Sequence, residues 1–258
     1  MLYATQTGVA DEQPIVFVHA GGFSGTMWRE IAALLPDKNC VLPDLPGHGN
    51  SRNVPFDSIE GCADELAGFI KQQTFTGPVD LVGLSFGSYV GLLLMARHPH
   101  LVRSAMLSGF HVCGMPNPRL MKLMGYITAP LMQLRWMRRK NAQAMGLKDD
   151  SLTSDEQGNP LADVATVRRL LNEAVDFDAR EILSAIDIPT LAIAGGKEHK
   201  TILKSLSLLQ DRMPDCIARI VPGSGHAWCA EHPDLFAATV RSWVSSQAVP
   251  DRLEAVKP

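Results

Sequence analysis

The chain has 258 residues, 46% of them hydrophobic and 20% charged, as is ordinary for one globular domain of moderate size. Its net charge of -3 gives no general attraction to nucleic acid or to acidic membranes, so neither is expected as a partner. No apolar run approaches the ~18 residues that span a bilayer. Residues 1–14 contain neither the basic nor the apolar region of a signal peptide. We therefore expect a cytoplasmic protein without stable membrane insertion.

The cysteines indicate a reducing compartment. They are odd in number, scattered along the chain, and spaced unlike the ligands of a metal site. We expect them to be structural or incidental thiols, and we expect neither a metal nor an organic cofactor. The cysteines are Cys40, Cys62, Cys113, Cys216 and Cys229.

The first part of the chain alternates between short apolar runs and longer segments with helical periodicity. The apolar runs, rich in β-branched and aromatic residues, predict buried strands at 14–19, 39–43, 79–82 and 101–107. Helices are predicted at 27–35, at about 58–73 with Asp57 or Ser58 as the cap, and at 88–97. This alternation is typical of βαβ units, so we expect an α/β fold with a mostly parallel sheet covered by helices on both faces.

The alternation is interrupted in the middle of the chain. Between 111 and about 182 no run predicts a strand, and the helical segments are broken by prolines. The pattern then resumes with strands at 188–194 and 216–221 and helices at 201–211 and 233–246. We predict a core formed by residues 1–110 and 183–258, with residues 111–182 inserted as a helical cap, or lid, at the edge where the strands end.

A serine lies in a short motif between a predicted strand and a predicted helix. Residues 83–87 read Gly-Leu-Ser-Phe-Gly and match G-x-S-x-G, which in this context predicts a nucleophile elbow. The flanking glycines let the strand and helix backbones approach closely. Ser85 is thereby expected at the top of the sheet, near the positive end of a helix dipole.

A serine nucleophile needs a base, and the base needs a third group that fixes its tautomer. Among eight histidines, His226 is the candidate base because it lies on a glycine-rich loop beyond a strand's carboxyl end, where ligand sites of α/β sheets collect. The acid follows by elimination. No Asp or Glu occurs from 109 to 148, and Glu198 lies on the loop after the 188–194 strand. Glu198 is therefore the predicted acid.

The resulting order of nucleophile, acid and base is the one described for α/β-hydrolases. The chain resembles the α/β-hydrolase fold family over nearly its whole length, in four separated segments that occur in the family's order. They are the segment from His-Ala-Gly-Gly at 19–22 through Trp28, Pro-Asp-Leu-Pro-Gly-His-Gly-Asn-Ser at 43–51, the motif at 83–87, and Gly-Ser-Gly-His at 223–226 followed by Glu-His-Pro at 231–233. A serine nucleophile also separates the chain from haloalkane dehalogenases and epoxide hydrolases, the relatives that use Asp.

The resemblance implies an oxyanion hole and two structural histidines. One amide is expected from Phe86 and the other from Gly21 or Gly22, each worth roughly 10²–10³ in rate. His19 and His48 resemble the family's loop-bracing histidines. The chain departs from the family in having Glu where the acid is usually Asp. It also has His-Ala-Gly-Gly in place of the commoner His-Gly, which leaves Gly21 and Gly22 as alternatives.

The predicted cap is asymmetric in charge. Residues 109–148 contain seven basic residues and no acid, whereas residues 149–181 contain nine carboxylates and three arginines. One interpretation is a basic lid that attracts an anionic substrate, such as a carboxylate or a phosphopantetheinyl thioester. The other, which we favour, is that the two halves pack as complementary charged helices.

Methionine is also concentrated in the predicted cap. Six of the eleven methionines occur between 115 and 145, which fits either a pliable acyl pocket or ordinary packing. The run at 131–140 has some character of a membrane-surface helix, but its apolar residues are mixed with basic ones, so the sequence does not favour that role.

We predict a serine hydrolase that acts through an acyl-enzyme on a small to medium ester, as carboxylesterases do. Its partner would be a small-molecule acyl substrate. Cleavage of a thioester or of a C–C bond, acyl transfer and a lyase reaction are alternatives that use the same three residues. The alternative from another class is a non-catalytic, ligand-binding homologue.

Overall fold

The computed structural model describes residues 1–75, 77–144, 153–155 and 160–256. In this part of the chain eight strands form one sheet in the order β1-β3-β2-β4-β5-β6-β7-β8. The strands from β3 to β7 are parallel, and β1 and β8 pair antiparallel at the two edges. Their bounds are β1 (Ala4–Gly8), β2 (Pro14–Val18), β3 (Asn39–Pro43), β4 (Val79–Leu84), β5 (Val102–Ser108), β6 (Thr190–Gly195), β7 (Cys216–Val221) and β8 (Glu254–Ala255).

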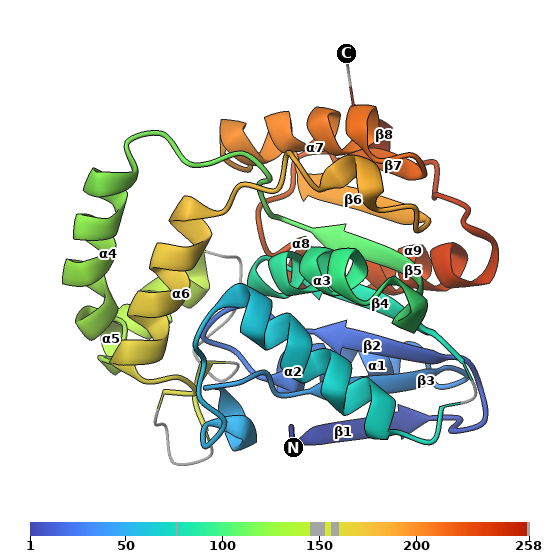
Figure 1. The fold of residues 1–258 in the computed structure, drawn as a ribbon, viewed down its shortest axis with the longest axis horizontal. Helices are drawn as coiled ribbons and strands as arrows, with labels where there is room; N and C mark the ends of the chain where they lie inside the picture. Colours follow the sequence, from blue (N-terminus) through green and yellow to red (C-terminus); the bar gives the residue numbers. More distant parts are fainter. Residues whose placement is uncertain (76, 145–152, 156–159, 257–258) are drawn as a thin grey trace.

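Helices cover both faces of the sheet (Figure 1). Successive residues of a strand point to opposite faces, and in β2 this places Val16 and Val18 in one apolar core and Ile15 and Phe17 in the other. The first core is closed by α2 (Ile59–Gln72), α3 (Phe86–Arg97) and α7 (Lys200–Arg212). The second is closed by α1 (Arg29–Ala33), α8 (Trp228–Glu231) and α9 (Pro233–Ser246). The predicted α/β fold with a mostly parallel, doubly covered sheet is confirmed.

Two predictions for the N-terminal part of the chain need correction. The helix predicted at 27–35 is a 3-10 turn, Gly25–Trp28, followed by the short α1. Ser24 starts this turn by accepting a hydrogen bond from the Thr26 amide, and Pro36 disfavours helical geometry at the residue before it. The edge strand β1 was not predicted, because its sequence Ala-Thr-Gln-Thr-Gly is polar and only partly buried.

Among the described residues, three α-helices lie between β5 and β6 in the chain and pack beside one end of the sheet (Figure 1). They are α4 (Pro118–Leu131), α5 (Arg135–Ala144) and α6 (Val164–Asp176). Lys122 of α4 forms an ion pair with Asp176 of α6. The Arg168 guanidinium of α6 lies 3.9 Å from the centroid of the Tyr126 ring. These contacts are of the kind expected if the basic and acidic halves of the insertion pack against each other.

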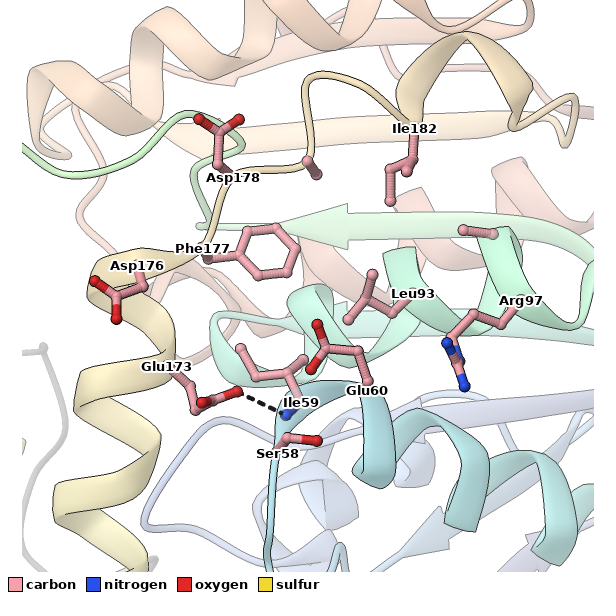
Figure 2. A pocket seen from close by; sticks show the side chains of 12 residues that line it. Ser58, Ile59, Glu60, Leu93, Arg97, Glu173, Asp176, Phe177, Asp178 and Ile182 are labelled. Carbon is pink, nitrogen blue, oxygen red and sulfur yellow. Dashed lines mark hydrogen bonds between the residues drawn. The ribbon is translucent and has the colours of Figure 1, made fainter.

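Helix α6 is fastened to the amino-terminal end of α2. Glu173 accepts a hydrogen bond from the Ile59 amide at 3.2 Å, beside a groove of about 610 Å³ (Figure 2). One turn earlier, Arg169 donates to the Phe56 carbonyl at 2.8 Å and to the Asp57 carboxylate at 3.0 Å. A carboxylate at a helix N-terminus satisfies an amide that has no partner within the helix. The insertion is thus held to the core through polar contacts as well as apolar ones.

Candidate active site

Ser85 occupies a strained position between β4 and α3. Strand β4 ends at Leu84 and α3 begins at Phe86, so the serine alone makes the turn. Its φ of 54° and ψ of -115° are unfavourable for a residue with a side chain. Its amide donates to the Ser108 carbonyl at 2.8 Å, and its carbonyl accepts from the Ser88 amide at 2.9 Å. A serine held alone in a turn between a strand and a helix is what a nucleophile elbow would require.

The two glycines of the motif are fixed by the backbones around them. A Cβ at Gly87 would lie 2.1 Å from the Val18 carbonyl oxygen, in the neighbouring strand β2. A Cβ at Gly83 would lie 2.8 Å from the Gly87 carbonyl oxygen. The tight strand-to-helix connection therefore excludes any side chain at either position.

His226 and Glu198 form a direct pair. The His226 Nδ1 and Glu198 Oε2 atoms are 2.6 Å apart, and the glutamate side chain is 1% exposed while the histidine side chain is 29% exposed. The other carboxylate oxygen accepts from the Gly195 amide at 3.1 Å. Because the carboxylate accepts the proton on Nδ1, Nε2 is left as the basic nitrogen. The residues chosen by elimination and by loop position are therefore in contact.

The three predicted residues follow β4, β6 and β7, and β5 lies between the first two of these strands. The end of β5 contacts both groups. The Ser108 carbonyl accepts the Ser85 amide. A Cβ at Gly109 would lie 2.9 Å from His226 Cε1 and 3.4 Å from Glu198 Oε1. Ser108, the last residue of β5, thus contacts the Ser85 backbone, and Gly109, directly after it, lies against the histidine–glutamate pair.

Ser108 is a buried hydrogen-bonding centre that the sequence reading missed. Its amide donates to Ser88 Oγ at 2.9 Å, and Ser88 Oγ donates back to its carbonyl at 2.8 Å. Its hydroxyl accepts from Trp228 Nε1 at 2.9 Å. Trp228 stands two residues after His226, and the side chains of Ser88, Ser108 and Trp228 are fully buried. A serine at the end of an apolar strand was the available signal, but its partners lie 20 and 120 residues away.

The predicted oxyanion loop follows β2 and turns sharply. The Phe23 amide donates to the Ala20 carbonyl at 3.2 Å, and Gly22 has a φ of +79°. Gly21 and Gly22 lie inside this turn. On the other side, Phe86 is the first residue of α3, where an amide has no acceptor within its own helix. These are the amides that the resemblance implied.

Two buried histidines brace the same loop. His19 Nε2 accepts from the Leu45 amide at 2.9 Å, and its Nδ1 donates to the Ala20 carbonyl at 2.8 Å. The rings of His19 and His48 lie edge to face, with centroids 5.1 Å apart. Burial lowers the pKa of His19 to about 4 and that of His48 to about 3. Both are neutral near pH 7, which suits a structural role.

A cavity of about 310 Å³ lies between this loop and the insertion. The loop contributes residues 21–23, and the insertion contributes mostly apolar side chains, among them Met132, Leu161 and Leu170. Leu170 packs directly on the loop, since a Cβ at Gly21 would lie 2.6 Å from its Cδ1. Of the methionines singled out in the sequence, Met132 lines this cavity, and Met145 lies outside the described residues.

The described residues contain no cluster of three His, Cys, Asp or Glu side chains that could hold a metal ion. All five cysteines are free thiols. Burial raises the pKa of Cys40 to about 11 and those of Cys216 and Cys229 to about 12, so these thiols stay protonated and are poor nucleophiles. No helix of the described ranges is both long and apolar enough to cross a bilayer.

Comparison with known proteins places this chain in a family. Residues 15–239 match the alpha/beta hydrolase family. A pimeloyl-[acyl-carrier protein] methyl ester esterase of Neisseria meningitidis serogroup B is 30% identical over 254 residues, covering 89% of this chain and 92% of that protein. An AB hydrolase superfamily protein of Gibberella zeae is 28% identical over 252 residues, covering 95% and 84%.

Solved structures show the same fold. A thermophilic esterase from Thermogutta terrifontis superposes with a TM-score of 0.76 at 23% identity, covering 94% of this chain and 92% of that one. A lipase-esterase related protein from Clostridium acetobutylicum superposes with a TM-score of 0.78 at 21% identity, covering 94% and 99%. At these identities the likeness establishes the architecture of the chain.

Proposed function

The chain belongs to the alpha/beta hydrolase family, and we propose that it is a serine hydrolase that cleaves small to medium carboxylic esters through an acyl-enzyme. The observation that carries this proposal is the 2.6 Å contact between His226 and Glu198, on the same sheet edge as the strained elbow of Ser85. A buried carboxylate that holds an imidazole in one tautomer is the device that activates a serine. The relatives named as esterases support an ester as the substrate.

The proposed reaction has two halves. Ser85 Oγ attacks the ester carbonyl carbon while His226 Nε2 takes the hydroxyl proton, and collapse of the tetrahedral intermediate breaks the bond to the alkoxy group. The alcohol leaves with the proton from His226. Water then attacks the acyl-enzyme, gives a proton to His226, and releases the carboxylic acid as the proton returns to Ser85. Glu198 stabilises the imidazolium in both halves.

The proposed oxyanion hole consists of the Phe86 amide and the amide of Gly21 or Gly22. Phe86 opens α3, so the positive end of this helix dipole adds to the field at the oxyanion. The histidine-braced turn after β2 supports the second donor, because its backbone is held in place before a substrate binds.

We propose that residues 111–182 form a cap that selects the acyl group. The cavity of about 310 Å³ beside the oxyanion loop supports this, because its far wall comes from the insertion and is mainly apolar. A cavity of this size and lining favours an apolar acyl part of modest length.

A fluorophosphonate probe tests the chemistry. Wild-type protein should be labelled covalently, and Ser85→Ala should not. With p-nitrophenyl esters of rising chain length, His226→Ala should lower kcat by roughly 10⁶ and Glu198→Gln by about 10⁴. His100→Ala is a matched control, since this histidine is exposed just before β5, at the opposite end of the strand from the candidate site.

The outcomes separate the alternatives. Absence of labelling in correctly folded wild type would favour the non-catalytic homologue. Labelling without turnover of any ester would direct the search to thioesters, β-diketones or acyl acceptors other than water. Normal turnover by Glu198→Gln would mean that another carboxylate is the acid.

A further inference from the structure

Large apolar side chains gather on the outer surface of the insertion. From α4 into α5, eight of them are at least one-third exposed, from 36% at Leu131 to 62% at Tyr126. Elsewhere in the described ranges, the exposed large apolar residues are Met1, Tyr3, Val9 and Leu34. A concentration of this kind on one element marks an interaction surface. We call it the outer face, formed by Leu120, Leu123, Met124, Ile127, Leu131 and Leu134.

The outer face is one continuous stripe of helix α4 and the turn after it. Its members recur at intervals of three or four residues, which places them on the same side of a helix. The opposite side of α4 packs inward. Ala129 is fully buried, and Gly125 lies against Leu171 of α6. In Figure 1, α4 is the outermost helix, with α6 between it and α3. The six side chains of the outer face are each at least 36% exposed.

The charged side chains of the segment that carries this stripe have one sign, although Asp176 of the neighbouring α6 pairs with Lys122. Residues 109–148 contain no acidic residue. Arg119 precedes the stripe, and Arg139 and Lys140 follow it on α5, all three with exposed side chains. Trp136, which is 56% exposed, lies one helical turn before these last two cations. An apolar stripe bordered by cations and an exposed tryptophan is the composition of a helix that lies in a membrane interface.

We propose that the outer face docks the protein on the surface of bilayers that contain anionic lipids. The apolar side chains would enter the boundary between headgroups and acyl chains, and the flanking cations would meet lipid phosphates. A second copy of the chain fits this surface less well. A symmetric contact would bring the cations of both copies together, with no carboxylate between 109 and 148 to offset them.

Docking in this orientation has a consequence for the neighbouring cavity. Thr128 of α4 and Met132, directly after the helix, line the cavity beside the oxyanion loop, and neither belongs to the outer face. The cavity would therefore lie one helix away from the lipid. Membrane binding itself rests on the outer face alone and does not depend on the proposed ester hydrolysis.

Sedimentation with lipid vesicles tests the proposal. Wild-type protein should bind vesicles of phosphatidylcholine mixed with phosphatidylglycerol more tightly than vesicles of phosphatidylcholine alone, and salt should weaken the difference. The double variant Leu123→Ser with Ile127→Ser should lower the partition coefficient by about tenfold per side chain. The double variant Arg139→Gln with Lys140→Gln should lower it by about fivefold per cation, for the anionic vesicles alone.

The matched control changes exposed apolar residues elsewhere. Val9→Ser with Leu34→Ser removes two side chains of similar exposure and should leave vesicle binding unchanged. Circular dichroism melting checks that each variant folds. Ser85→Ala should bind vesicles like the wild type, and Leu123→Ser with Ile127→Ser should hydrolyse a soluble short-chain ester like the wild type. Vesicle binding therefore tests the docking proposal and ester turnover tests the proposed function, so either proposal can be refuted without the other.

Two results would overturn the docking proposal. One is wild-type protein that does not sediment with anionic vesicles. The other combines two measurements. Analytical ultracentrifugation would show a wild-type dimer that the Leu123→Ser, Ile127→Ser variant does not form, and the variant and the wild type would bind vesicles equally. The second result would assign the outer face to a copy of the chain.

Discussion

Replacing Gly109 by alanine should separate a local effect on the proposed base from an effect on the fold. Gly109 has a φ of +69°, where a side chain costs roughly 1–2 kcal/mol of stability. Its added Cβ would lie 2.9 Å from His226 Cε1 and 3.0 Å from Nδ1, whereas ordinary contacts begin near 3.4 Å. The imidazole must therefore move by about 0.5 Å, which is the tolerance of a catalytic arrangement.

The displacement has one easy direction. His226 is 29% exposed and can swing outward, but Glu198 is 1% exposed and also holds the Gly195 amide, so the carboxylate cannot follow. The 2.6 Å contact between them should lengthen. Since a misplacement of about 1 Å in a catalytic site costs about 10²-fold, we expect kcat to fall by roughly ten- to a hundredfold.

Gly223→Ala is the matched control for this experiment. Its φ of +71° is nearly that of Gly109, but no atom lies within 4 Å of the added Cβ. Both variants should lose similar stability in urea unfolding, because both carry the same backbone strain. Turnover of a saturating p-nitrophenyl ester should fall for Gly109→Ala and stay near the wild-type value for Gly223→Ala. Equal turnover by the two variants would refute the role assigned to Gly109.

Two further predictions concern buried groups. Burial lowers the pKa of His19 from an ordinary 6.5 to about 4. As pH falls below 6.5, the unfolded chain therefore binds a proton at this residue that the folded chain does not bind. Unfolding free energy should therefore drop by about 2 kcal/mol from this group between pH 7 and pH 5, and urea titrations that show no drop would contradict it. Trp228→Phe removes the hydrogen-bond donor to Ser108 Oγ. It should lower the free energy of unfolding by about 1–2 kcal/mol and should lower kcat without raising KM. Trp243→Phe is its control, since the buried Nε1 of Trp243 has no hydrogen-bond partner in the described structure; equal effects of the two changes would argue against an anchor at Ser108.

The sequence predicted those parts of the fold whose cause is local. Strands such as β2 and β3 are fully buried, and apart from Asn39 at the start of β3 each is a run of apolar residues. The edge strand β1 is partly exposed and polar, and β8 has two residues, so neither has such a run. Helix α8 is a single turn, too short for a periodic pattern.

The same distinction applies to the candidate site. Ser85, Glu198 and His226 stand on loops at strand ends, and topology alone brings such loops to one edge of a parallel sheet. Their assignment as nucleophile, acid and base stays a prediction for the experiments above. Ser108 and Gly109 directly follow the strand predicted at 101–107, and the sequence assigned neither of them to the site. Their importance comes from Trp228 Nε1 and the His226 ring, and contacts between distant segments leave no pattern in the sequence.

The end of β5 also has a consequence for chimeras in which the proposed cap is exchanged. Gly109 lies two residues before the proposed cap segment, so the strand end that contacts the histidine is close in the chain to the segment that would select the acyl group. A chimera whose foreign cap segment starts at residue 111 would retain Ser108 and Gly109. It should take its acyl specificity from the foreign cap and keep the contacts of Ser108 and Gly109 at the site. A crossover placed a few residues earlier would replace both. Swapping of caps between relatives is therefore expected to succeed or fail according to the position of one junction.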